Sequence, residues 1–191
     1  MWYYEETGKG IIILRSHMRP GSIVIILFSA IILFFSGCAP ESGINKKKFS
    51  ELNRTVQDLK TALSSEEPCN MPDKLLQSLN SGITSLKDKA ASQDEHRLIA
   101  AYSDLLIVCN DGMLLCRSRS KFVSFQFVPK GRVYVTQDLD PLVEKYGFTT
   151  ERHLYQPTGE YWRSIAADSI NVIWENARFQ IKIIENMVNY N

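Results

Sequence analysis

The sequence has no excess of charge of either sign. It carries 22 Lys and Arg against 21 Asp and Glu in 191 residues, a formal net charge of +1. This balance excludes a strongly basic nucleic-acid-binding protein and an acidic tail protein. Pro and Gly are sparse, at 7 and 10 residues, which excludes collagen-like and Pro-rich low-complexity chains. With 45% hydrophobic and 23% charged residues, the composition is that of a folded globular domain.

Catalytic motifs are lacking as well. The sequence contains no G-x-S-x-G elbow, P-loop, H-E-x-x-H or G-x-G-x-x-G. Its four Cys form no C-x-x-C pair, and no Cys or His has zinc-ligand spacing, so we expect no metal and no cofactor. The one cluster of titratable residues around a predicted loop is Glu151, His153, Glu160 and Tyr161. An acid–base role is conceivable there, but an exposed His beside Arg152 is the commoner arrangement, and we predict a protein that is not an enzyme.

Apolar residues are concentrated near the N-terminus. Ile23–Phe35 is nearly all Ile, Val, Leu and Phe, and Gly21–Gly37 contains no charge. A signal peptide has an apolar segment of about 7–15 residues, whereas a membrane-spanning helix needs about 20. The length therefore favours a signal peptide and leaves a membrane span as the alternative.

The apolar segment ends in Phe35-Ser36-Gly37-Cys38. Small residues before a Cys, after a short apolar run, resemble the lipobox of bacterial lipoproteins, with Phe35 where Leu is usual. The resemblance implies that residues 1–37 are removed and that Cys38 receives a diacylglyceryl group and an amide-linked acyl chain such as palmitate. Because Ala39 and not Asp follows, it also implies an outer-membrane location in a Gram-negative envelope. The alternative is an uncleaved anchor in which Cys38 is incidental.

The predicted domain organisation follows from this cleavage. Residues 1–37 form the signal peptide, 38–48 the lipidated Cys and a tether, and 49–191 a single domain. A start at Met18 gives a short positive segment before the apolar run, so we predict that Met18 is the true start. Lys46, Lys47 and Lys48 follow the tether. They either contact anionic lipid, at about 1 kcal/mol each, or lie at the solvated start of a helix.

The predicted fold is mainly α, an antiparallel bundle of about four helices with a small β-hairpin insertion. Residues 47–64 carry an apolar stripe spaced by three and four: Phe49, Leu52, Val56, Leu59 and Leu63. The stripe packs on its own domain or pairs with a partner as a coiled coil. A second helix begins near Pro72, and a third, 93–117, is apolar nearly all round, as in the centre of a bundle. Residues 158–189 form the last helix.

The segment after the third helix has a different pattern. Phe122–Val128 and Arg132–Thr136, on either side of Pro129-Lys130-Gly131, predict a β-hairpin. A short helix, 140–147, and one further helical turn, 149–156, follow. Residues 113–137 contain five basic residues and no acidic one: Arg117, Arg119, Lys121, Lys130 and Arg132. They are candidates for contact with lipid phosphates, a glycan or an anionic partner surface, and the alternative is a solvated face.

Three Cys remain once Cys38 is acylated. Ser92 to Glu95 has the composition of a capping box, and folding the chain back near residue 92 sets Cys69 opposite residue 115. Cys69–Cys116 is therefore the favoured disulfide, with Cys109 as a buried free thiol. Pairing of Cys109 with Cys116 requires a break at the turn-like Asn110-Asp111-Gly112, because a continuous helix separates their Cα atoms by about 10 Å.

These observations predict a membrane-anchored envelope lipoprotein that acts as a non-enzymatic accessory or scaffold protein. Its partners are the membrane, through the N-terminal lipid, and a protein of the cell envelope, and nucleic acid is not expected. One alternative is a small-ligand or lipid binder with a cavity between the apolar third helix and the Trp-containing last helix. The other is a hydrolase built on His153, which requires a convergent polar cleft there.

Overall fold

The computed structural model describes residues 43–122 and 127–190. These fall within one compact unit, Pro40–Asn191. The predicted signal peptide, Cys38 and part of the predicted first strand lie outside the described residues.

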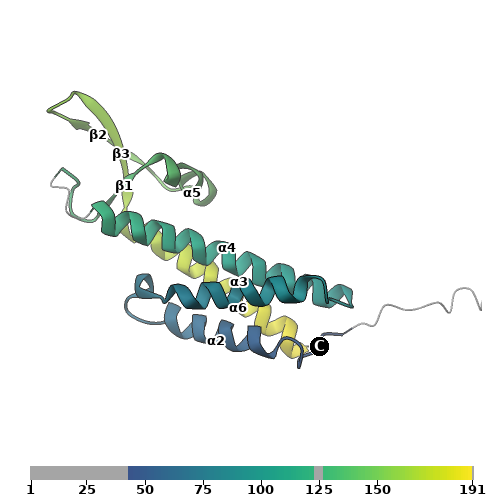
Figure 1. The fold of residues 1–191 in the computed structure, drawn as a ribbon. Coiled ribbons are helices and arrows are strands. Elements are labelled where there is room, and N and C mark those ends of the chain that lie inside the picture. Colours follow the sequence, from purple (N-terminus) through teal and green to yellow (C-terminus); the bar gives the residue numbers. More distant parts are fainter. Residues whose placement is uncertain (1–42, 123–126, 191) are drawn as a thin grey trace, which may run out of the picture. The chain divides into compact units, whose positions relative to one another are not determined.

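Four long helices of the described chain form an antiparallel bundle: α2 (Ser50–Leu63), α3 (Asp73–Lys87), α4 (Gln93–Phe122) and α6 (Ile170–Tyr190) (Figure 1). Each packs on two others, in the order α2, α3, α4, α6 and back to α2. Gln57 of α2 contacts Glu185, and the carbonyl of Leu63 accepts from Arg178, so α2 and α6 run in opposite directions. The predicted mainly helical bundle is confirmed.

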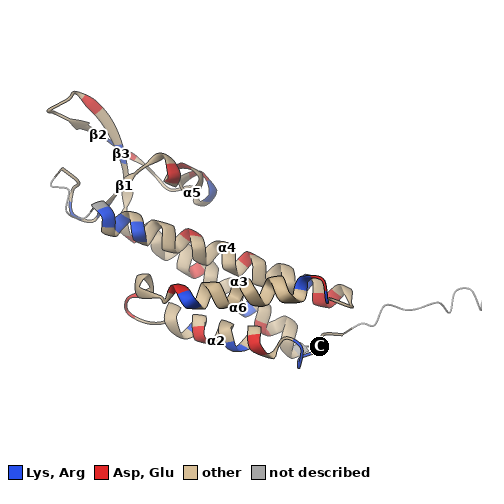
Figure 2. Cartoon of the chain, in the orientation of Figure 1, with Lys and Arg blue, Asp and Glu red and all other residues tan. Residues whose placement is uncertain are grey.

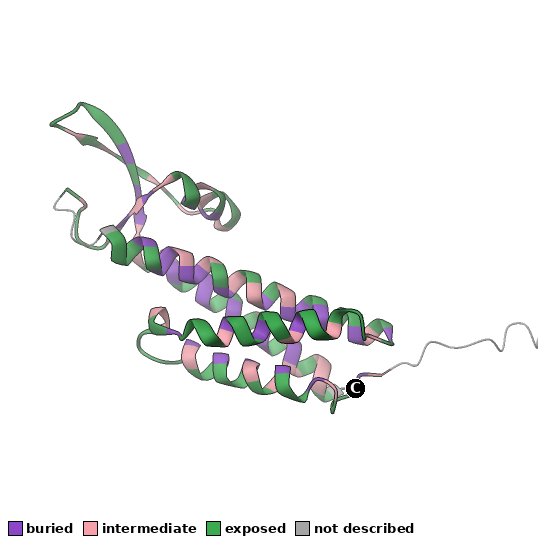
Figure 3. Cartoon of the chain, viewed as in Figure 1, coloured by how far each residue is buried: buried purple, intermediate pink, exposed green. Residues whose placement is uncertain are grey.

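The apolar stripe of α2 is buried inside its own domain. Phe49, Leu52, Val56, Leu59 and Leu63 are each at most 2% exposed. Charged residues occupy outward positions on the helices (Figure 2), and buried residues follow the sides where helices meet (Figure 3). Each fully buried Leu contributes about 1.5–3 kcal/mol. The stripe is therefore core, and it is not available as a coiled-coil surface.

The central helix α4 is continuous through Asn110-Asp111-Gly112. Gly112 is needed there because the indole of Trp174, on α6, packs against the α4 backbone. A Cβ at this position would lie 2.2 Å from the Cη2 atom of Trp174, which is itself 2% exposed. The turn-like composition thus marks a close approach of two helices and not a break. Among the described residues only α4, over Gln93–Lys121, is long and apolar enough to cross a membrane, and 56% of its apolar window is buried, as in a core helix.

A three-stranded antiparallel sheet lies between α4 and α6 in the sequence. The strands are β1 (Arg132–Val135), β2 (Glu151–Tyr155) and β3 (Glu160–Ala166), in the order β1-β3-β2. The helix α5 (Asp140–Tyr146) and three short 3₁₀ helices (Pro68–Asn70, Gln137–Leu139 and Ala167–Ser169) complete the described elements. Residues 132–166 are called the sheet module below.

Several sequence predictions fail in this region. The expected partner of β1 was Phe122–Val128, but β1 pairs with β3, Phe122 ends α4, and residues 123–126 lie outside the described chain. The predicted helical turn at 149–156 is strand β2, and the last helix begins at Ile170 and not at residue 158. The hairpin is formed by β2 and β3, because Gly159 adopts φ +72° in the turn that joins them.

A disulfide joins Cys69 to Cys116, with Cα atoms 5.5 Å apart. It ties the short 3₁₀ helix before α3 to the last third of α4. Cys109 is a free, buried thiol. This is the pairing that the sequence favoured, and it follows from the short connection between α3 and α4.

Candidate functional site

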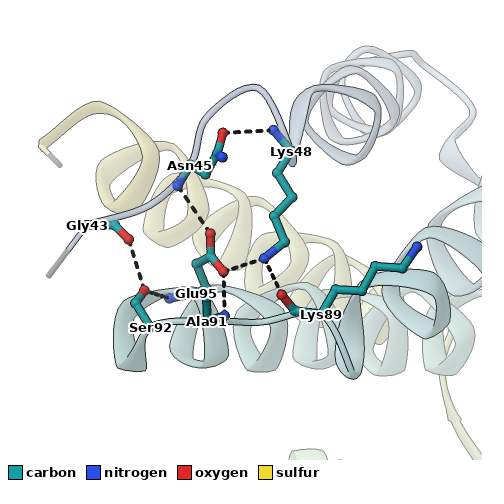
Figure 4. Close-up of polar contacts among 7 residues, drawn as sticks. All are labelled: Gly43, Asn45, Lys48, Lys89, Ala91, Ser92 and Glu95. Atoms are coloured by element: carbon teal, nitrogen blue, oxygen red, sulfur yellow. Dashed lines mark hydrogen bonds and ion pairs between the residues drawn. The ribbon is translucent and has the colours of Figure 1, made fainter. Parts of the chain in front are cut away.

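Residues 43–48, the second half of the segment predicted as the lipidated Cys and tether, are fixed to the loop between α3 and α4 and to the start of α4 by hydrogen bonds (Figure 4). We call this set of residues the N-terminal clamp: Gly43, Asn45, Lys48, Lys89, Ala91, Ser92 and Glu95. The clamp joins positions 41 to 50 residues apart in the sequence. It therefore determines which end of the bundle the N-terminal segment leaves from.

Glu95 is the centre of the clamp and is only 3% exposed. Its Oε2 accepts from Lys48 Nζ at 2.5 Å and from the Ala91 N–H at 2.8 Å, and its Oε1 accepts from the Asn45 N–H at 3.3 Å. Ser92 Oγ accepts from the Glu95 N–H at 3.1 Å and donates to the Gly43 carbonyl at 2.9 Å. Ser92 thus caps α4 as the predicted capping box requires, whereas the carboxylate of Glu95 accepts from the Ala91 N–H, one residue before the cap, and also holds the N-terminal segment.

Burial by itself raises the pKa of Glu95. The hydrogen bonds from Lys48, Ala91 and Asn45, with the charge of Lys48, outweigh it and hold the pKa of this carboxyl below its ordinary value. Glu95 is therefore ionised at neutral pH, and the ion pair with Lys48 is intact.

The three lysines after the tether have different surroundings. Lys48 is committed to the clamp, since Nζ also donates to the Lys89 carbonyl. Lys46 and Lys47 are exposed. Of the three lysines predicted to contact lipid, Lys46 and Lys47 are thus accessible, whereas Lys48 is hydrogen-bonded within the domain.

The predicted His153 cluster lies on the sheet module. His153 Nε2 is 2.7 Å from Ser164 Oγ, and the His153 ring stacks on Trp162 with centroids 4.3 Å apart. Ser164 Oγ also accepts from Arg132 Nε at 3.0 Å, and Arg132 forms a 3.0 Å ion pair with Glu151. A Ser–His contact is the geometry of an activated nucleophile. Ser164, however, is fully buried in the central strand and already accepts from Arg132, so no substrate carbonyl can reach it.

Glu160 and Tyr161 are not part of this network. Tyr161 is 62% exposed and lies under the guanidinium of Arg152, whose Cζ is 4.5 Å from the ring centroid. Glu160 is exposed at the turn between β2 and β3, where its N–H donates to Thr158. The four residues that the sequence grouped therefore divide into a structural network and an exposed turn.

Aromatic side chains that the sequence analysis did not single out gather on the same sheet. Phe127, Tyr134, Tyr155 and Trp162 lie with ring centroids 5.2–6.2 Å apart, and a pocket of about 110 Å³ is beside them. Phe127 is 39% exposed, whereas Trp162 is 9% exposed. The spacing of Tyr134, Tyr155 and Trp162 across the strands follows from the registers of β1 and β2 on β3, which could not be predicted from the sequence.

The five basic residues predicted to contact an anionic surface differ in whether they form ion pairs within the domain. Arg117 pairs with Asp73 at 3.0 Å, Arg132 pairs with Glu151, and Lys121 also has an interaction partner. Arg119 and Lys130 are exposed and pair with no carboxylate among the described residues. Figure 2 shows basic positions at the C-terminal end of α4. A contact with an anionic surface thus depends chiefly on Arg119 and Lys130.

A groove of about 890 Å³ lies between α2 and α3. Most of the residues that line it are polar, such as Thr55, Asp58 and Ser78, and Leu52 and Gly82, which lie against each other, are also among them. No three His, Cys, Asp or Glu side chains within residues 43–122 and 127–190 lie close enough to hold a metal ion.

Comparison with known proteins gives no relative from which a site can be transferred. No protein-family model matches the chain, and no curated protein or solved structure is significantly similar to it. The candidate sites therefore depend on their own geometry.

Proposed function

We propose that this chain is a lipid-anchored protein of the bacterial cell envelope that acts as a non-enzymatic accessory or scaffold protein. Acylated Cys38 holds it on the membrane, in the outer membrane if the cell is Gram-negative. The helical bundle presents the sheet module to a protein partner. The observation that carries the proposal is the lipobox-like Phe35-Ser36-Gly37-Cys38, followed within five residues by a folded clamp that begins at Gly43.

The anchor has the strength that this role needs. Each buried CH₂ contributes about 0.8 kcal/mol, so two or more acyl chains hold a protein firmly where one holds it reversibly. The clamp then connects this anchor to the folded domain through several hydrogen bonds, one of them a charge-assisted bond of 2.5 Å.

The geometry of the other candidate sites supports a protein-binding or scaffold role over the two alternatives, a small-ligand binder and a hydrolase. The small-ligand alternative needs a cavity between α4 and α6, and these helices pack closely where Trp174 lies against Gly112. The contact of His153 with Ser164 is inaccessible to a substrate. By contrast, Leu154 and Tyr161 are directly paired across β2 and β3 and are 51% and 62% exposed. Exposed apolar side chains gathered in this way are typical of protein interfaces.

Metabolic labelling tests the anchor. Cells that express the chain are fed radiolabelled palmitate, and the intact mass of the purified protein is measured. We expect incorporation, a chain that begins at Cys38, and loss of both with Cys38→Ser, while Cys109→Ser, as the matched control, retains them. An unlabelled protein that keeps residues 1–37 would show the uncleaved anchor instead.

Site-directed photo-crosslinking tests the presenting surface. A photoreactive residue replaces Tyr161 in the sheet module or Thr84 on α3, both of which are exposed. We expect one defined envelope protein to be captured from position 161 and not from position 84. Equal capture from both positions would contradict presentation by the sheet module.

A further inference from the structure

We infer that the clamp end of the bundle is a contact surface for the anionic headgroups of phospholipids, and that it holds the sheet module away from the bilayer. This inference rests on the proposed acylation of Cys38. It goes further by stating which surface faces the lipid, which lipid chemistry it contacts and which end of the domain is left free for partners.

The first step is the reach of the chain. Cys38 and Gly43 are five residues apart, which is at most about 17 Å when fully extended. Gly43 and Asn45 are hydrogen-bonded to Ser92 and Glu95, at the start of α4 (Figure 4). An anchor at Cys38 therefore keeps Gly43 within about 17 Å of the lipid interface, and the start of α4 lies directly beside Gly43.

The second step is the charge at this end. The clamp places the segment of Lys46 and Lys47 beside the segment of Lys87 and Lys89, because Lys48 Nζ donates to the Lys89 carbonyl. All four lysines are exposed, and none pairs with a carboxylate among the described residues.

The acidic residues nearby do not cancel this charge. Asp94 is paired with Arg97 at 3.6 Å, and buried Glu95 is paired with Lys48. Of the described acidic residues nearby, only the exposed carboxylates of Asp88 and Glu51 are left to oppose the four lysines. The surface is therefore net basic where the anchor brings it close to lipid. A Lys near an anionic bilayer is attracted within about a Debye length of 8–10 Å.

The third step is the length of α4. Its 30 residues rise by about 45 Å. The helix begins at the clamp, and its other end contacts β1 of the sheet module. When the clamp end is at the headgroups, the turn between β2 and β3 is therefore tens of Å from them. The exposed Leu154 and Tyr161 are then directed to partners beyond the membrane surface.

Fluorescence quenching in vesicles tests the inference. The acylated protein carries a thiol-linked probe at Ala91→Cys or at Gln156→Cys, both exposed positions, while buried Cys109 stays unlabelled. Vesicles contain a headgroup-nitroxide lipid in phosphatidylcholine, with or without phosphatidylglycerol. We expect strong quenching at position 91, more so with phosphatidylglycerol, and little at position 156.

A charge-matched pair of variants completes the test. Gln at Lys46, Lys47, Lys87 and Lys89 should remove the phosphatidylglycerol dependence at position 91. Gln at four exposed basic residues elsewhere should preserve it: Lys74, Arg119, Lys130 and Lys182.

Two results obtained with protein that carries palmitate would overturn the inference. One is equal quenching at positions 156 and 91, and the other is quenching at position 91 that does not change with phosphatidylglycerol. If the protein purified from cells instead carries no palmitate, the proposed anchor is overturned, and this inference with it.

Discussion

Replacing Glu95 by Gln tests whether the clamp is a stabilising element. The change keeps the shape of a side chain that is 3% exposed but turns one acceptor oxygen into an NH₂ donor. In the best orientation of the Gln side chain, its oxygen takes the place of Glu95 Oε2, which accepts from Lys48 Nζ at 2.5 Å and from the Ala91 N–H at 2.8 Å. The new NH₂ group then opposes the Asn45 N–H, which now has no acceptor there.

The expected cost follows from these contacts. The bond from the Asn45 N–H is part-buried, so the loss of its acceptor costs no more than a buried donor left without a partner, about 1–3 kcal/mol, and weakening the charge-assisted bond to Lys48 adds about 1 kcal/mol. We expect Glu95→Gln to lower the free energy of unfolding by about 2–4 kcal/mol. Glu185→Gln is the matched control, because Glu185 accepts from Lys60 at 2.7 Å and from Gln57 at 3.0 Å on the surface. An exposed pair of this kind contributes at most about 1 kcal/mol.

Urea titration of the purified protein in mild detergent measures both changes. The pH dependence gives a second criterion, because the pKa of Glu95 is lowered in the folded state from an ordinary value of 4.5. The stability that this lowered pKa contributes is present above that value and is lost as the pH falls through the folded-state pKa. The gap between wild type and Glu95→Gln should therefore narrow in acid. Equal costs for Glu95→Gln and Glu185→Gln, or a gap that widens in acid, would refute the reasoning.

Three further predictions concern the core. Gly112→Ala should lower the unfolding free energy by about 1–2 kcal/mol, because overpacking against Trp174 costs about 1–3 kcal/mol and helix propensity returns up to about 1; a double-mutant cycle with Trp174→Phe should remove the penalty, and no coupling would contradict it. Joint replacement of Cys69 and Cys116 by Ser should lower the free energy of unfolding in urea by about 4 kcal/mol, for a separation of 47 residues, and an unchanged free energy of unfolding would contradict this expectation. Burial raises the pKa of Cys109 to about 12, so maleimide should label it only on unfolding, and labelling of the folded protein at neutral pH would show that the core opens.

Much of the bundle could be predicted because its determinants are local. The apolar spacing of Phe49 to Leu63 and the cap at Ser92 are set within a few residues of sequence, and the structure has both the buried stripe and the bond from the Glu95 N–H to Ser92. The short connection after α3 makes α3 and α4 antiparallel neighbours. That single constraint is enough to set Cys69 opposite Cys116.

The sheet could not be predicted because its determinants are not local. In β3 the buried residues Trp162 and Ile165 are three apart, which fits one face of a helix as well as a strand. Only pairing with β1 and β2, up to 34 residues away, decides for the strand, as in Arg132 opposite Ala166. The contact of Ser164 with His153 and Arg132 depends on the same register and was missed with it.

The same limit applies to the clamp. The sequence indicates that Glu95 reaches back to the backbone before α4, and Ala91 does donate to it at 2.8 Å. That this carboxylate also holds Lys48, 47 residues earlier, follows only from the tertiary packing that brings the start of α2 to α4, where Phe49 stacks on Tyr102. A capping residue thereby becomes the point where the N-terminal segment is fixed.

The tripeptide Asn110-Asp111-Gly112 shows why composition alone misleads inside a packed helix. In a loop, each of these residues favours a turn. In α4, Asp111 instead accepts from Lys145 at 2.6 Å and from the Tyr146 hydroxyl at 2.8 Å, which ties α5 to the bundle. Gly112, one residue on, admits Trp174 from α6. Polar and small residues in the middle of an apolar helix are therefore where other elements attach, so the sheet module is connected to the bundle through contacts as well as through the chain.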